Sequence, residues 1–182
     1  TRYVSLNAEL ARRGLIRLDE DGRPLSWDAW CQTDGMSALI HLRDQGDEKL
    51  YERVRGLLEE LEESGLYGFS QFYTREEARE KFHLSGEFSF VVETDGYTSF
   101  GEWCEGPIAR EAPQEDYRCA RGDHGYLPSF GPQPILLAKG PDIRDGAVLE
   151  RARLVDEAPT YTRILGTELK DTDGKVLEGI LK

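Results

Sequence analysis

The sequence predicts an α/β fold, because stretches with the patterns of strands and of helices alternate along its 182 residues. The clearest helix lies between Asp47 and Gly65, where leucines and a valine recur every three or four positions. Asp-Gly pairs, which favour tight turns, interrupt several strand-like stretches. With 38% hydrophobic and 32% charged residues, the composition is that of a globular chain with one domain, or one domain and a subdomain.

Residues 1–35 are expected to form a helix and a hairpin. Ser5 is a candidate N-cap and Gly14 a candidate stop for the helix in "SLNAELARRG". "LIRLDEDGRPL" predicts two short strands around the pair Asp21-Gly22.

Residues 36–104 are expected to form a small α/β subdomain. It begins with the strand-like run "MSALIHL" and the long helix, whose acidic face is expected to be solvated. A second helix follows Thr74, which with Glu77 fits a capping box. "EFSFVVETDGYTSFGEW" predicts two strands that form a hairpin around Asp95-Gly96.

Residues 105–134 are rich in Pro and Gly and have no periodicity, which predicts a long loop. Residues 135–182 are expected to supply a terminal strand, a helix and a tail. "PILLAKG" is a candidate buried strand, and the helix of "VDEAPTYTRILG" has Asp156 near its start and Gly166 past its end.

The net charge of −12 and the isoelectric point of about 4.8 argue against binding to nucleic acid or to an anionic membrane surface. No apolar run is long enough to span a bilayer, so we expect no membrane partner. Three widely spaced cysteines do not suggest a disulfide framework. We therefore expect a cytoplasmic location, unless a targeting segment precedes Thr1, which is not a methionine.

His124 is the main candidate for a metal ligand, since a neutral imidazole binds zinc and similar ions well. Gly122 and Gly125 would allow the backbone to approach a substrate closely. Asp123 is either a second ligand or a residue that orients the imidazole. Spacing alone favours the simpler interpretation, a loop histidine without a special role.

Other candidate sites are weaker. Cys104 and Cys119 could join His124 in a zinc site, but the paired CxxC spacing is absent. His41 and His83 are expected to pack or to cap a helix. No nucleophile with its base, no P-loop and no GxGxxG motif can be recognised, so no catalytic residue is assigned in this chain.

The stretch from residue 122 to residue 166 resembles the C-terminal end of the nucleotide pyrophosphatase/phosphodiesterase branch of the alkaline phosphatase superfamily. The matching features are the pair His124-Gly125, the loop "YLPSFGPQP", the run "ILLAKGP", the motif "VDEAPT" and the pair Leu165-Gly166. This resemblance implies the C-terminal portion of an alkaline-phosphatase-like fold: a small α/β subdomain plus the terminal strand and helix of the core. It also implies that residues 1–35 link this portion to a preceding core.

The resemblance also implies a phosphoester hydrolase with two divalent metals, expected to be zinc, and a small-molecule phosphate ester as substrate. It makes His124 a metal ligand, leaves Asp123 open, and places Tyr126 and the loop 127–134 in the wall of the site. The nucleophile and the other ligands would lie upstream. The chain is therefore expected to be a C-terminal fragment of the enzyme, inactive when isolated.

One alternative remains, a complete non-catalytic α/β module for binding or assembly, which would need no nucleophile. In the fragment hypothesis, the apolar face meant for the missing half would be exposed and would favour self-association. The run "ILLAKGP" would then lie at a sheet edge or pair with another segment.

Overall fold

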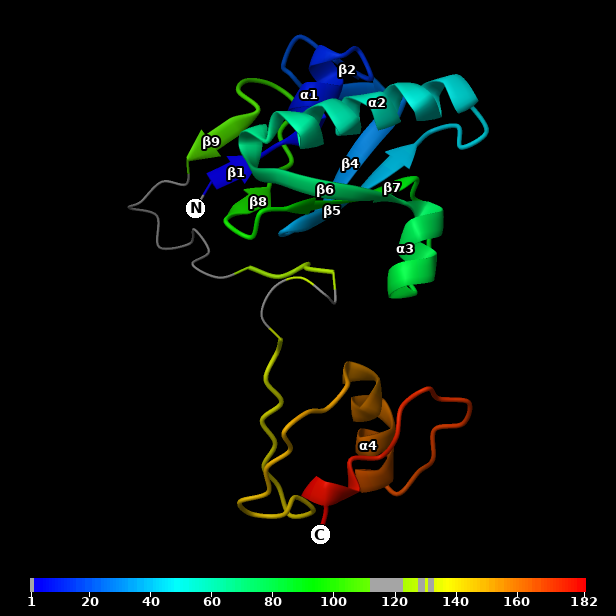
Figure 1. The fold of residues 1–182 in the computed structure, drawn as a ribbon, viewed down its shortest axis with the longest axis vertical. Helices are drawn as coiled ribbons and strands as arrows, with labels where there is room; N and C mark the ends of the chain where they lie inside the picture. The colour runs from blue at the N-terminus through cyan, green and yellow to red at the C-terminus, as the bar shows by residue number, and fades with distance from the viewer. Residues whose placement is uncertain (1, 112–122, 128–129, 131–132) are drawn as a thin grey trace. The chain divides into compact units, whose positions relative to one another are not determined.

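The structure, a computed structural model, describes residues 2–111, 123–127, 130 and 133–182 (Figure 1). It is a mixed α/β fold with helices and several sheets, as predicted. The chain divides into two compact units, residues 1–131 and residues 132–182. No helix in the described ranges is both long and apolar enough to cross a membrane.

The first unit is built on a four-stranded antiparallel sheet in the order β4-β5-β7-β6 (Figure 1). These strands are β4 (Ala29–Asp34), β5 (Ser37–Leu42), β7 (Phe90–Thr94) and β6 (Phe69–Thr74). Helix α2 (Glu48–Ser64) lies across one face of this sheet and contributes its apolar stripe to the main core. The buried residues that meet there include Ala38, Ile40, Val54, Leu57, Leu58, Leu61, Phe90 and Val92.

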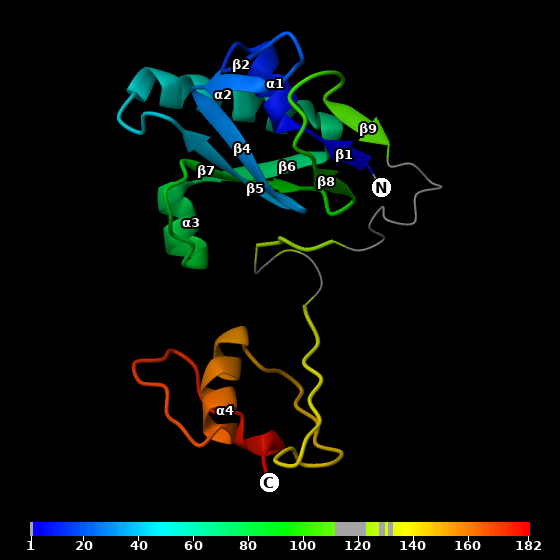
Figure 2. The ribbon, with the colours of Figure 1, turned by 180° about the vertical axis from the view of Figure 1, so that it is seen from behind.

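The opposite face of this sheet, called here the outer face, is covered less completely (Figure 2). Helix α3 (Arg75–Phe82) packs there through Ala78. The second apolar cluster consists of Ala78, Phe88, Val91 and Leu127, with several partly buried side chains around it. Leu127 brings a segment distant in sequence onto this face.

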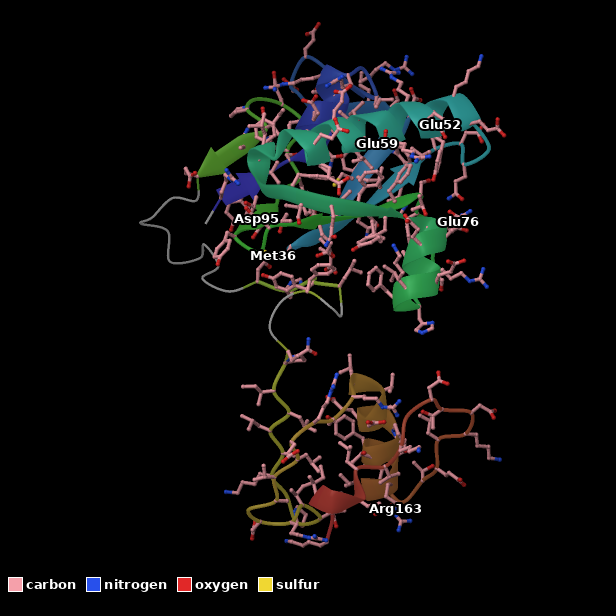
Figure 3. The ribbon with its side chains drawn as sticks, viewed as in Figure 1. Met36, Glu52, Glu59, Glu76, Asp95 and Arg163 are labelled. Atoms are coloured by element: carbon pink, nitrogen blue, oxygen red, sulfur yellow. The ribbon has the colours of Figure 1, made fainter. Side chains whose placement is uncertain are left out.

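The helix boundaries follow the capping signals in the sequence. Asp47 caps α2 through hydrogen bonds from the first-turn amides, and Gly65 ends it in the left-handed conformation. Thr74 and Glu77 form the predicted capping box of α3, and His83 ends that helix at φ +57°. Figure 3 labels Glu52 and Glu59 on α2, and both side chains are exposed, as expected for the acidic face.

The N-terminal elements also agree with the sequence prediction. Helix α1 (Leu6–Arg12) starts at the N-cap Ser5 and is followed by a left-handed Gly14. Strands β2 (Ile16–Leu18) and β3 (Pro24–Trp27) form the predicted antiparallel hairpin. The sequence analysis did not predict β4, which pairs with β5 along six residues, so the structure does not separate residues 1–35 from the following part.

The predicted hairpin around Asp95-Gly96 is wrong. Strand β8 (Thr98–Phe100) does not pair with β7 but runs parallel to β1 (Arg2–Val4), in a sheet of order β8-β1-β9. Both edges of β7 are already occupied by β5 and β6, so β8 must find another partner. The third strand, β9 (Ala109–Glu111), lies in the range predicted to be a loop.

The second unit contains helix α4 (Glu157–Ile164), which the sequence predicted, and the 3-10 turns η2 (Leu154–Asp156) and η3 (Glu178–Ile180). Its other regular pairing is an isolated bridge between Ile143 and Leu181. The run 135–139 forms no strand, contrary to prediction, because no strand among the described residues lies beside it to complete its hydrogen bonds.

Candidate functional site

A row of polar side chains crosses the outer face of the four-stranded sheet near one end. Asp34 of β4 is opposite Ser37 of β5, Ser37 is opposite Glu93 of β7, and Glu93 is opposite Gln71 of β6. Residues that are opposite each other in neighbouring strands project to the same face, so these four form one line. Figure 3 labels Met36 and Asp95, which lie at this end of the sheet.

Residues 123–127, called here the His124 segment, lie on this polar row. The Met36 N–H donates to the His124 carbonyl at 2.9 Å. The Leu127 N–H donates to Glu93 Oε1 at 3.1 Å. These two bonds fasten the backbone of the segment to β7 and to the turn between β4 and β5.

Two glycines make this close approach possible. Gly125 has φ +86°, and a Cβ there would lie 1.5 Å from the Asp34 carbonyl oxygen. Gly35 has φ +70°, and a Cβ there would lie 2.4 Å from the His124 carbonyl oxygen. Any larger residue at either position would push the two backbones apart. The close approach at Gly125 is to the protein's own backbone at Asp34, so the predicted approach to a substrate is not tested, and Gly122 lies outside the described residues.

The imidazole of His124 projects away from this anchored backbone, with about 80% of the side chain exposed. Its Nδ1 lies 3.7 Å from Asp34 Oδ1. This separation is longer than a hydrogen bond, so Asp34 lies near the ring without fixing which nitrogen carries the proton. The segment therefore holds an exposed imidazole on an anchored backbone.

Asp123 lies next to His124, but its carboxylate is engaged within the protein. Oδ1 accepts from the His124 N–H at 2.9 Å, and Oδ2 accepts from the Ser99 hydroxyl at 2.5 Å. Ser99 is buried in β8. The bond from Ser99 anchors the segment to β8, while the roles considered from the sequence, metal ligand or orienting residue, stay predictions.

The described residues do not form a complete metal site. Within residues 2–111, 123–127, 130 and 133–182, no three His, Cys, Asp or Glu side chains gather closely enough to hold an ion. Cys31 and Cys104 are free and buried, and Cys119 lies outside the described residues. A metal at His124 would therefore need further ligands from outside the described residues.

Glu93 is a site residue that the sequence analysis missed. Its side chain is about 1% exposed, and burial raises its pKa to about 7, against the opposing effect of the Leu127 N–H. A carboxylate in an otherwise apolar strand, "FVVET", was the available signal. The pattern could not show that a distant loop supplies its hydrogen-bond donor.

A cavity of about 460 Å³ opens beside the segment on the outer face. Its polar rim includes Gln32, Thr33 and Asp34, and its apolar wall includes Leu39, Phe82, Leu84, Val91, Tyr126 and Leu127. The Tyr126 hydroxyl donates to the Gly96 carbonyl at 3.4 Å, and partial burial raises its pKa. Because Asp34 contacts His124 and also lines the cavity, the imidazole and the cavity are adjacent.

The other two histidines have structural roles, as expected. His83 ends α3. His41 Nδ1 donates to the Glu87 carbonyl at 2.9 Å, and its Nε2 lies 2.9 Å from Gln32 Oε1. His83 is exposed, as His124 is, so exposure alone does not distinguish the two.

Comparisons of this chain with protein-family models, with curated proteins and with solved structures found no match.

Proposed function

We propose that this chain is the C-terminal part of a metal-dependent phosphoester hydrolase of the nucleotide pyrophosphatase/phosphodiesterase type, in which His124 is one metal ligand. The order of motifs from the His124-Gly125 pair to Leu165-Gly166 suggests this family. The observation that carries the proposal is the exposed imidazole of His124 on a backbone anchored to the sheet.

This arrangement suits a ligand whose partners lie on another part of the enzyme. A ligand imidazole must be held in one orientation, and a nearby carboxylate commonly orients it. Here Asp34 lies beside Nδ1, and the Met36 N–H and the Glu93 carboxylate fix the backbone. The free cysteines Cys31 and Cys104 support a reducing compartment, so we place the enzyme in the cytoplasm.

In the proposed enzyme, the metals would polarise the phosphoryl group and activate the nucleophile. The residues of this chain would hold one ion at His124 Nε2 and receive the substrate. Tyr126 and the apolar wall of the 460 Å³ cavity would bind the organic group of the ester. The isolated chain should not hydrolyse phosphoesters, because the described residues bring no three potential metal ligands together.

The test is His124→Ala in the protein produced from its complete coding sequence. We expect loss of hydrolysis of bis(p-nitrophenyl) phosphate by at least about a hundredfold, together with a lower metal content. His83→Asn is the matched control, because asparagine also tolerates the left-handed position that ends α3. Full activity of His124→Ala would remove His124 from the site.

The cavity supports a second candidate, a non-catalytic binding module. It is lined by residues of the first unit and needs no metal to be formed. In that case a small apolar ligand would bind the chain with the same affinity before and after His124→Ala. Leu84→Trp, which would fill the cavity, would abolish that binding.

A further inference from the structure

Glu93 poses a physical problem that the proposed chemistry does not solve. A carboxylate about 1% exposed in the central strand β7 is costly, and the ion needs compensation. Among the described residues it forms no ion pair, and its hydrogen-bond donor is the Leu127 N–H. An apolar residue would fit the strand at lower cost, as Val91 does on the same face.

The hydrogen bond from the Leu127 N–H to Glu93 joins the His124 segment to the central strand β7. Leu127 is three residues after His124, and its side chain packs into the cluster with Val91 and Phe88. The segment is held at its other end by Asp123 and Ser99 and in its middle by Met36. Without Glu93, the backbone N–H of the buried Leu127 would lose its acceptor.

We propose that Glu93 is a positioning residue, whose buried carboxylate docks residues 123–127 onto the outer face and so fixes the direction of the His124 imidazole. The docking is a property of the chain by itself. Its consequence for metal binding rests on the proposed function.

The electrostatic surroundings make this docking responsive to pH. The ionisable groups that interact with Glu93 are the phenols Tyr73 on β6 and Tyr126 in the segment, and Asp123 adds negative charge near Tyr126. None of these groups is a cation, so none of them stabilises the ionised carboxylate of Glu93. The Leu127 N–H favours the ionised carboxylate, but burial outweighs it and raises the pKa of Glu93 to about 7. Ionisation above that pH therefore favours exposure of the carboxylate and release of the segment.

The experiment measures the protection of backbone amides by hydrogen exchange and the NMR signals of the three histidines in the metal-free chain. Glu93→Leu removes the acceptor, Glu93→Gln keeps an acceptor without the charge, and Gln71→Leu is the matched control. Gln71 occupies the same polar row beside Glu93, and its side-chain oxygen accepts from the Tyr73 hydroxyl.

In Glu93→Leu we expect the Leu127 amide to lose about tenfold or more of its protection, and the His124 signals to move. The signals of His41 and His83 should not move, and Gln71→Leu should leave Leu127 protected. In the wild type, protection of Leu127 should fall between about pH 5.5 and about pH 8, after correction for intrinsic exchange. Glu93→Gln should restore the His124 signals and abolish this pH dependence.

Unchanged protection of Leu127 and unchanged His124 signals in Glu93→Leu would overturn the proposal. If Glu93→Leu fails to fold, the test is the pH dependence of Leu127 amide protection in the wild type and in Glu93→Gln. An identical pH dependence in the two proteins would also overturn the proposal. The hydrogen-exchange and NMR measurements need no metal and no substrate. They therefore remain valid if the hydrolase proposal fails, and loss of hydrolysis in His124→Ala tests that proposal separately.

Discussion

Residues 2–111 and residues 133–182 each contain a helix whose ends follow sequence signals, but different forces hold the two parts together. In the first part, α2 and the sheet bury an extended apolar core. No described residue of the second part belongs to either apolar cluster. There, the buried side chains around α4 include the polar Asp156 and Thr160.

The second unit is organised around hydrogen bonds to those two residues. Asp156 accepts from the backbone and guanidinium of Arg153 and from the Lys175 N–H. Thr160 donates to the Asp156 carbonyl and accepts from the Leu177 N–H. Several large apolar side chains remain exposed, including Leu137 at 88%. An apolar pattern thus became a core only where a second surface was present to cover it.

The comparison predicts that the first unit is most sensitive to loss of apolar volume. Phe90 is fully buried, with its ring centroid 4.7 Å from that of Tyr51 and 6.0 Å from that of Phe72. Phe90→Ala should lower the free energy of unfolding of this unit by about 3–5 kcal/mol, because it leaves a cavity. All three tryptophans lie in this unit, so urea unfolding followed by tryptophan fluorescence measures it. A loss below about 1 kcal/mol would contradict the proposed role of this core.

The next largest effect concerns the buried charge. The pKa of Glu93 is raised from 4.5 to about 7, so the folded state binds the proton more tightly than the unfolded state. Stability from this group is present below pH 4.5 and is lost as the pH rises to about 7, by up to about 3 kcal/mol. Glu93→Gln should remove this part of the pH dependence of unfolding.

Glu80→Gln, on the exposed side of α3, is the control for that measurement and should leave the pH dependence unchanged. If Glu93→Gln and the wild type lose stability in parallel between these pH values, then Glu93 is not the titrating group.

The second unit should instead be sensitive to loss of a polar contact. The Arg153 guanidinium, with the Lys175 N–H, holds the pKa of Asp156 well below its usual range. Stability from this group is present above pH 3.8 and is lost as the pH falls further. Asp156→Asn should lower the melting temperature of α4 by several degrees, as followed by its NMR amide signals, and leave the tryptophan signal unchanged. Asp145→Asn, at an exposed position, should change neither signal.

The smallest expected effect is at the exposed apolar positions of the second unit. Leu137→Ser should change the stability of this unit by less than about 0.5 kcal/mol, because Leu137 contributes little buried area. Sedimentation measurements should show weaker self-association of this variant, if the exposed run mediates it. A loss comparable to that of Ile180→Ala, at a buried position, would mean that Leu137 is covered in solution.

The sequence predicted most of the local structure, because its signals act over a few residues. The caps of α1, α2 and α3 and the hairpin of β2 and β3 follow from residues next to the element they start or stop. Helix α4 was also predicted, although no side-chain hydrogen bond caps its start. The pairing of β8 with β1 could not be predicted in this way. A pair of turn residues signals a reversal of the chain, but it does not show whether the preceding strand has a free edge.

The sequence by itself determined where most helices begin and end and which residue was the candidate ligand. Only the tertiary structure decided what surrounds His124 and why glycine is needed at position 125. It aligned Asp34, Ser37, Glu93 and Gln71 across four strands and set Leu127 over Glu93. Capping and periodicity arise from neighbours in the chain, whereas strand partners and buried charges are defined by residues that are neighbours only in space.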